Sequence, residues 1–206
     1  MFGLFALFLI GMSLAGQRQY NEEQTAHGEE TVSYVGYLAS PHFVEAVFEN
    51  WESEFLQMGA FVLLTVFLFQ KGSPESKKGE GEAVDEDPRN SENDDAPWLV
   101  RTGGVKLWLY ERSLTIALFT LFFLSFALHA AGGAREHSAE QVAHGGSEVG
   151  TLSYIGTSKF WFESFQNWQS EFLAVGALVV LSIYLRQRGS PESKPVAAAH
   201  AETGTE

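Results

Sequence analysis

The chain has 206 residues, enough for one or two domains, and it carries 26 acidic against 13 basic residues, a formal net charge of −13. Such an acidic balance argues against nucleic acid as a partner, because binding to phosphates needs clustered Lys and Arg. The absence of Cys from the sequence excludes disulfides, thiolate zinc sites and cysteine nucleophiles.

Apolar and polar residues are segregated into blocks along the chain. Four blocks are apolar all round, without the alternation of a half-buried strand or the polar stripe of a helix in a soluble bundle. They comprise residues 1–16, 55–69, 114–131 and 172–185. As a helix the third block covers roughly 27 Å, close to the roughly 30 Å of hydrocarbon in a bilayer. We therefore predict an all-α, multi-pass membrane protein with four transmembrane helices.

The first block allows a second interpretation. Ser13 and Ala15 are small residues that suit a signal-peptidase site. No basic residue precedes the apolar run, however, and we expect a retained helix.

An amphipathic helix is predicted to lead into the second block. Ser40 is a suitable N-cap and Pro41 a suitable first helical residue. At 100° per residue, residues 43–57 place a broad apolar arc beside one narrow acidic stripe. The stripe consists of Glu45, Glu49 and Glu52. We expect this lead-in, and its counterpart before the fourth block, to lie at the outer membrane surface or to pack over the other helices.

Each lead-in contains an Asn-Trp pair just before the apolar run, Asn50-Trp51 and Asn167-Trp168. An indole at the level of the lipid headgroups buries its ring and still donates its N–H. We expect these four residues to be interfacial anchors.

Glu54 and Glu171 follow these pairs at the edge of the hydrocarbon, and Glu54 lies off the acidic stripe. Carboxylates within a membrane often mark ion or proton paths, which makes the two residues candidate functional carboxylates. The alternative is that each stays hydrated among the headgroups or is bonded to Asn50 or Asn167, one turn back.

Gly59 and Gly176 place small residues at matching depth in the second and fourth blocks. Small residues let transmembrane helices approach each other closely. We expect the two halves of the chain to pack against each other through this face.

The sequence repeats itself. Residues 50–77 match residues 167–194 at a constant offset of 117, and His27-Gly28 matches His144-Gly145, with a small shift expected between these matches. Each repeat would cross the membrane twice and enter from the same side, which predicts two parallel-repeat helical hairpins. The expected divisions are a first repeat at 1–76, an acidic linker at 77–97, a second repeat at 98–194 and a tail at 195–206.

The linker is rich in Gly and acidic residues and has almost nothing apolar to bury, so we expect it and the tail to be disordered. Basic residues follow the second and fourth blocks and precede the third. The positive-inside rule therefore places the linker and both termini in the cytoplasm. Residues 98–113 mix Trp and Tyr with basic residues and are expected to lie along the inner membrane surface.

Histidines gather in the two outer segments, at His27, His42, His137 and His144. The sequence has no close ligand spacing such as HExxH, so we expect solvated histidines rather than a metal site. His129, near the outer end of the third block, is expected to be interfacial.

A set of short motifs in the first half carries a family resemblance. The set consists of Tyr20-Asn21-Glu22-Glu23, His27-Gly28, His42-Phe43, the run from Glu49 to Leu56, and Gly72-Ser73. These motifs resemble an uncharacterised family of small bacterial integral membrane proteins, a domain of unknown function. The match covers residues 16–77 and, more loosely, 98–194. The resemblance implies the bacterial inner membrane and no enzymatic role.

No nucleophile, base and orienting residue can be named together, so we expect no catalytic residues, no metal and no cofactor. The sequence favours a non-enzymatic membrane protein with an envelope structural, stress or partner-binding role. Its expected partners are the lipid bilayer and a second copy of this chain or another membrane protein. The alternative is a small transporter, channel or proton-coupled protein that uses Glu54 and Glu171.

Overall fold

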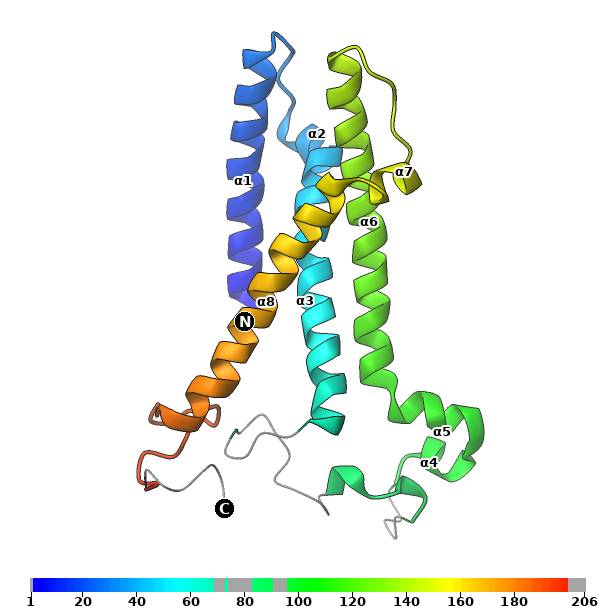
Figure 1. Cartoon of the computed structure of the whole chain (residues 1–206), viewed down its shortest axis with the longest axis vertical. Coiled ribbons are helices and arrows are strands. Elements are labelled where there is room, and N and C mark those ends of the chain that lie inside the picture. Colours follow the sequence, from blue (N-terminus) through cyan, green and yellow to red (C-terminus); the bar gives the residue numbers. More distant parts are fainter. Residues whose placement is uncertain (1, 69–72, 74–82, 91–95, 200–206) are drawn as a thin grey trace. The chain divides into compact units, whose positions relative to one another are not determined.

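The computed structural model describes residues 2–68, 73, 83–90 and 96–199. Within this part of the chain all regular structure is helical, as predicted, and no strand occurs. Four long helices contain the four apolar blocks or most of their residues (Figure 1). They are α1 (Phe2–Ala26), α3 (Pro41–Phe67), α6 (Ser113–Ala143) and α8 (Ser158–Tyr184).

Short helices connect the long ones. The chain turns back from α1 to α3 through α2 (Tyr34–Leu38), and from α6 to α8 through α7 (Thr151–Ile155) (Figure 1). Between α3 and α6 the described residues form the 3₁₀ turns η1 (Ala83–Asp85) and η2 (Pro88–Asn90) and the helices α4 (Trp98–Thr102) and α5 (Gly104–Glu111).

The lead-in and the apolar block form one uninterrupted helix in α3. The helix begins at Pro41, and the Ser40 hydroxyl accepts a hydrogen bond from the Phe43 N–H at 3.2 Å, which confirms the predicted N-cap. The Thr157 hydroxyl accepts from the Phe160 N–H at 3.3 Å in the same way at the start of α8. Local capping thus fixes where both helices begin.

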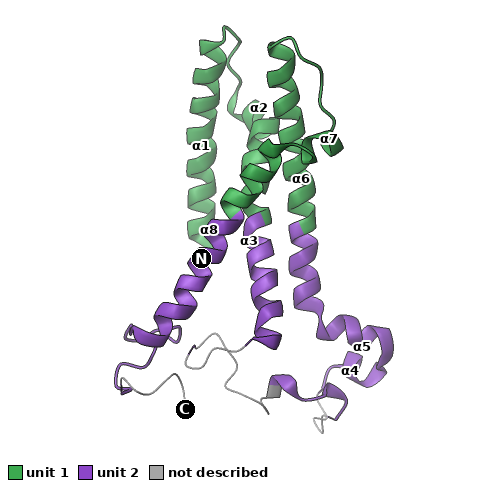
Figure 2. Cartoon of the chain, viewed as in Figure 1, with its two compact units in different colours: residues 1–52, 123–167 green, residues 53–122, 168–206 purple. Residues whose placement is uncertain are grey.

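Contacts between residues divide the chain into two compact units (Figure 2). Unit 1 contains residues 1–52 and 123–167, and unit 2 contains residues 53–122 and 168–206. Each unit takes residues from both halves of the sequence, so neither unit coincides with a predicted repeat.

The expected linker and tail are only partly described. Residues 77–82, 91–95 and 200–206 lie outside the described residues. The described linker residues include η1 and η2, and an ion pair of 2.6 Å joins Arg89 to Asp87. The division into repeats, disordered linker and disordered tail stays a prediction.

Aromatic contacts in unit 1 recur at positions 117 residues apart. Tyr37 of α2 packs against Phe43 with ring centroids 5.5 Å apart, and Tyr154 of α7 packs against Phe160 at 5.6 Å. Both tyrosines are almost completely buried. The spatial counterpart of Tyr154 is therefore Tyr37, although local sequence similarity aligns Tyr154 with Tyr34. The offset of 117 persists through the segment where a shift was expected.

Polar contacts in unit 1 recur at the same offset. The Asn21 side chain bonds both backbone groups of Val32, at 2.8 and 3.1 Å. The Ser138 hydroxyl bonds both backbone groups of Val149, at 2.9 and 2.8 Å. Each contact ties a long helix to the segment that leads into the following short helix.

The length and composition of α6 suit a membrane span, and α6 is the one such helix in the described part of the chain. Its most apolar 18-residue window has a mean hydropathy of 2.0. The apolar blocks in α1, α3 and α8 are shorter than 18 residues, and these helices continue into polar segments. Four transmembrane helices are therefore not supported on these criteria.

The expected helix-packing glycines differ in their surroundings within unit 2. A Cβ added to Gly59 would lie 3.3 Å from the Phe119 ring and 3.5 Å from Leu118 of α6. A Cβ added to Gly176 would meet no described atom within 4 Å. Gly59 thus lies against a neighbouring helix, and Gly176 does not.

Two helices in unit 1, α6 and α3, come close together at Gly132 of α6. A Cβ at this position would lie 2.8 Å from the backbone nitrogen of Glu45 and 3.2 Å from the backbone oxygen of Pro41. Because backbone atoms cannot rotate away as a side chain can, only glycine fits here without moving α3.

We predict that Gly132→Ala lowers the free energy of unfolding by about 1–3 kcal/mol, because the added methyl group overpacks the contact with α3. The matched control is Gly176→Ala, where space is open and Ala is the better helix former. The measurement is reversible unfolding of both variants in detergent micelles. Equal stability of the two variants would contradict the close approach.

Candidate functional site

One face of α3 carries the acidic stripe predicted from the sequence. Glu45, Glu49 and Glu52 are spaced by four and three residues and therefore share a face. In unit 1 this face turns toward α6 and α8, and Glu45 and Glu52 are only 8% and 0% exposed. The lead-in thus packs against other helices, which is one of the two placements expected for it; a position at the membrane surface stays a prediction. Burial of so many carboxylates requires polar partners.

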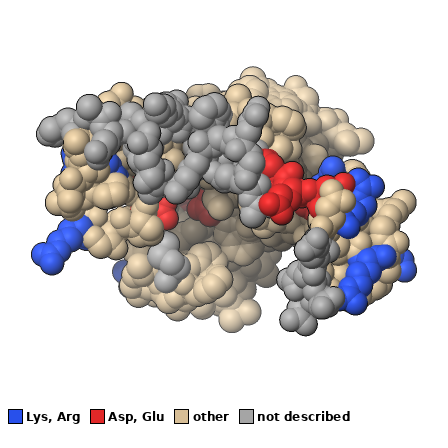
Figure 3. Space-filling model, turned by 90° about the horizontal axis from the view of Figure 1, so that it is seen from below, with Lys and Arg blue, Asp and Glu red and all other residues tan. Residues whose placement is uncertain are grey.

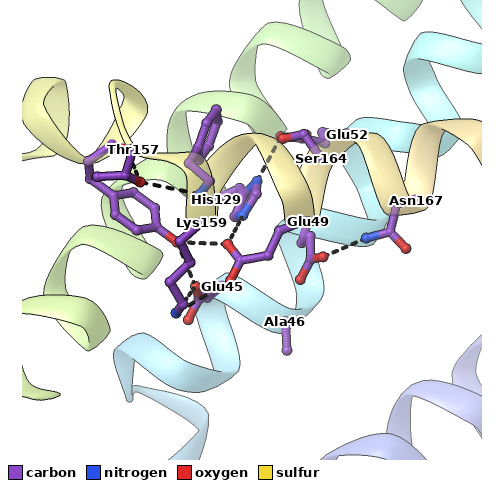
Figure 4. A network of polar contacts seen from close by, with 12 residues as sticks. Glu45, Ala46, Glu49, Glu52, His129, Thr157, Lys159, Ser164 and Asn167 are labelled. Atoms are coloured by element: carbon purple, nitrogen blue, oxygen red, sulfur yellow. Dashed lines mark hydrogen bonds and ion pairs between the residues drawn. The ribbon is translucent and has the colours of Figure 1, made fainter.

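Glu52 pairs with His129, and both side chains are completely buried (Figure 4). The distance from His129 Nδ1 to Glu52 Oε2 is 3.0 Å. The Ser164 hydroxyl of α8 donates to Glu52 Oε1 at 2.9 Å. Both carboxylate oxygens therefore have partners, from two different helices.

The His129 ring is held by stacking on Phe160, with ring centroids 4.9 Å apart and planes 28° apart. Its second nitrogen, Nε2, is buried and has no hydrogen-bond partner among the described residues. The nearest acidic atom is Glu163 Oε2 at 3.6 Å. His129 was expected at an interface. It lies instead at 0% exposure inside unit 1, because Glu52 and Glu163 provide a polar environment there.

The Tyr154 hydroxyl links two further carboxylates. It donates to Glu163 Oε2 at 2.7 Å and lies 3.2 Å from Glu45 Oε1. Burial and the two neighbouring carboxylates raise the pKa of Tyr154 above its ordinary value. The phenol therefore stays protonated and serves as a donor.

Lys159 is the cation nearest to these carboxylates. Its Nζ lies 3.3 Å from Glu163 Oε1 and 3.9 Å from Glu45 Oε1. Burial alone would lower the pKa of Lys159, but Glu45 and Glu163 raise it above its ordinary value. Burial also raises the pKa of Glu45 to about 7, although the charge of Lys159 opposes that shift. The group thus brings Glu45 and Glu163 together beside one lysine.

A cavity of about 810 Å³ adjoins this network within unit 1. Its polar lining is mostly acidic, with histidines from the two segments singled out in the sequence. The lining includes Glu23, Glu29, Glu45, Glu49, Glu136, Glu140, Glu163, His27, His42, His144 and Lys159. A cavity with such an excess of acidic groups attracts cations. His137, the remaining histidine of the two outer segments, has its Nδ1 atom 3.7 Å from Glu140 Oε2.

The candidate carboxylates Glu54 and Glu171 belong to unit 2 and are not members of this network. Glu54 is exposed and Glu171 is half-buried, and the two are close enough to interact electrostatically. Neither belongs to the unit that holds the cavity. Their role as functional carboxylates stays a prediction.

The expected interfacial anchors have partners inside the fold. Trp51 packs edge-on against Phe48, with ring centroids 5.2 Å apart. Trp168 packs against Phe122 at 6.2 Å. Asn167, within unit 1, donates to Glu49 Oε1 at 2.6 Å.

Asn50, in the first Asn-Trp pair, donates to the backbone oxygen of Ala46 at 2.8 Å. The side chain of Asn50 is exposed, and the exposure of the other three residues is intermediate. A position at a membrane surface stays a prediction for all four residues.

Sequence reasoning did not select His129, Tyr154, Lys159 or Glu163 for this site. One available signal was a histidine inside an otherwise uncharged apolar block, since such a residue needs a buried partner. The acidic stripe was recognised, and its spacing was correct. What no sequence pattern supplied was the pairing of that stripe with residues more than 75 positions away.

A family model described as a domain of unknown function, DUF6766, matches residues 1–205. The chain belongs to this family. No curated protein and no solved structure matches it. Membership of DUF6766 confirms the resemblance to a domain of unknown function and assigns no activity.

We predict that Tyr154→Phe lowers the free energy of unfolding by about 1–3 kcal/mol, because Glu45 and Glu163 lose a buried hydrogen-bond donor. Tyr184→Phe is the matched control, since Tyr184 is 67% exposed. Denaturant unfolding in detergent micelles measures both. A loss no larger than that of the control would mean that the hydroxyl does not stabilise the network.

Proposed function

We propose that this DUF6766 protein is a non-enzymatic integral membrane protein of the bacterial inner membrane. Its four long helices cross the bilayer as two like-oriented hairpins, and it acts in envelope structure or stress adaptation through contacts with lipid and with membrane partners. The observation that carries the proposal is the large apolar surface that the long helices expose.

Exposed large apolar residues occur on every long helix. They are spread around α1, for example, rather than confined to one face, since Phe2, Leu4, Phe5, Leu7, Phe8, Ile10 and Leu14 are all exposed. Soluble monomers rarely expose contiguous apolar patches larger than a few hundred Å². Hydrocarbon is the environment in which such a surface is favourable.

The lengths of the helices are compatible with crossing. The shortest of the four long helices has 25 residues. At 1.5 Å per residue this corresponds to roughly 37 Å, more than the roughly 30 Å of hydrocarbon. The polar parts of α1, α3 and α8 would then extend beyond the hydrocarbon, which accounts for their mixed composition.

The contacts that recur 117 residues apart support a tandem duplication of one hairpin. Two hairpins that enter from the same side place both connections through α2 and α7 on one face. The opposite face then contains the described segment between α3 and α6. Figure 3 shows Lys and Arg side chains over α4 and α5, and Arg101, Lys106 and Arg112 are exposed there. Basic residues favour the cytoplasmic side.

Cysteine labelling tests the topology, because the natural chain contains no Cys and gives no background. We predict that Glu30→Cys and Glu148→Cys react with a membrane-impermeant maleimide in spheroplasts. Glu86→Cys and Glu192→Cys should react only after the membrane is permeabilised. All four positions are exposed in the structure.

The same experiment distinguishes the four proposed crossings from a single crossing by α6. In that case residues 30 and 86 would share one face, and residues 148 and 192 the other. Such a pattern, or extraction of the unmodified chain from membranes by alkaline carbonate, would refute the proposal of four transmembrane helices.

A second candidate function is proton or ion conduction through Glu54 and Glu171. The observation in its favour is that the two carboxylates are close enough to interact in unit 2. This candidate predicts a proton flux into liposomes that contain the purified protein, with loss of the flux in the variant Glu54→Gln/Glu171→Gln. Glu192→Gln is the control. Absence of flux from the unmodified protein would eliminate the candidate.

A further inference from the structure

Three side chains in unit 1 bring metal-ligating atoms together. Glu45 of α3, His129 of α6 and Glu163 of α8 each offer one such atom, and these atoms all lie within 4.8 Å of one another. Donor atoms around a metal ion at roughly 2.1 Å lie roughly 3 to 4 Å apart. Small side-chain movements would therefore bring the three atoms to binding distance.

The unsatisfied Nε2 atom of His129 points to a ligand. The ring is completely buried, and Nδ1 is engaged by Glu52 at 3.0 Å. When Nδ1 donates its proton to Glu52, the lone pair of Nε2 faces the carboxylate of Glu163, which cannot donate to it when ionised. An acceptor nitrogen next to an acceptor oxygen is unfavourable unless a cation or a proton lies between them.

The pairing of His129 with Glu52 is also the usual support for a metal-binding histidine. Such a residue donates its other N–H to a carboxylate or carbonyl, which fixes the tautomer and the ring orientation. Glu52 is in turn bonded by Ser164, and Phe160 stacks on the ring. The histidine is thus held in one orientation before any ligand arrives.

The three side chains that offer these atoms are not needed to build the helical hairpin. The positions 117 residues away from His129, Glu45 and Glu163 are Met12, Phe162 and Ala46, none of which is a metal-binding carboxylate or imidazole. The recurrent contacts of Tyr37 and Tyr154 form in both places nonetheless. A purely structural network would be expected in both halves, whereas this one occurs once among the described residues.

We propose that Glu45, His129 and Glu163 bind a divalent transition-metal ion, with Glu52 as the residue that positions His129. One nitrogen and two carboxylate ligands suit Zn²⁺ or Mn²⁺ better than Mg²⁺ or Ca²⁺, which prefer oxygen ligands alone. The adjoining acidic cavity of about 810 Å³ provides the route of entry and room for water as a further ligand. Metal binding by these residues is independent of how the chain crosses a membrane.

Lys159 competes with the metal for the same carboxylates. Its ammonium group lies 3.3 Å from Glu163 and 3.9 Å from Glu45, so it supplies positive charge when no metal is bound. Its side chain is 39% exposed, which leaves it a path out of the site. Removing its charge should therefore strengthen metal binding, whereas removing a ligand should weaken it.

The test is isothermal titration of the full-length protein in detergent micelles with ZnCl₂, and electron paramagnetic resonance with MnCl₂ as the second probe. We expect one Zn²⁺ per chain. His129→Gln and Glu163→Gln should lower the affinity by at least about 10-fold, and Glu52→Gln by about 10-fold to 100-fold. Lys159→Met should raise it, and Glu54→Gln in unit 2 should leave it unchanged.

Two results would overturn the proposal. One is that the unmodified protein binds neither metal. The other is that metal binds elsewhere, shown by an affinity that is unchanged in Glu163→Gln and does not rise in Lys159→Met. Lys159→Met tests whether the metal binds at these carboxylates even where a ligand variant fails to fold, because Lys159 is not a ligand.

Discussion

The buried contact between Glu52 and His129 determines the arrangement of unit 1. Removing an ionisable group from water costs several kcal/mol, and the cost is met only when its partners satisfy it with good geometry. Glu52 therefore needs both His129 from α6 and Ser164 from α8. Because these residues lie on three different helices, satisfying one carboxylate fixes the register of α3 against α6 and α8. Few alternative packings of these helices would leave Glu52 paired.

The rest of the unit separates into contacts that recur and contacts that do not. The capping hydroxyls of Ser40 and Thr157 and the buried rings of Tyr37 and Tyr154 serve each connection in the same way. They are local contacts that turn a long helix back through a short one. The acid–histidine network has no equivalent of this kind, since Gln169 stands 117 residues from Glu52. The contacts that recur in both halves build the hairpin, and the contacts that occur once define the site around His129.

The sequence predicted the features that depend on local chemistry. The four apolar blocks and the Ser40-Pro41 start lead correctly to helices, and the spacing of Glu45, Glu49 and Glu52 gives their common face. It did not supply the features that depend on tertiary pairing. The edge of an apolar block drew attention to Glu54, whereas the burial of Glu52 depends on His129 and Ser164 from other helices.

His129 shows why tertiary pairing could not be inferred. Its neighbours in sequence are apolar, so composition alone suggests an interfacial residue. Its actual surroundings come from α3 and α8, through Glu52, Glu163 and Phe160. Those residues lie far away in the chain, and the offset of 117 gives no guidance because the network is absent from the repeat pattern. Only the presence of a titratable ring within an apolar block indicated that a buried partner was needed.

Polar contacts acquire a second role if the outer surfaces of these helices face lipid. Burial of apolar surface does not drive helices together in hydrocarbon, because lipid chains are as apolar as the side chains. Association then depends on close packing at small residues and on hydrogen bonds between helices. Gly132 provides the first between α6 and α3, and the network around Glu52 provides the second. The same buried groups would thus hold the helices together and present the His129 nitrogen to a ligand, so that a metal bound there would bridge α3, α6 and α8 and strengthen the packing that creates its site.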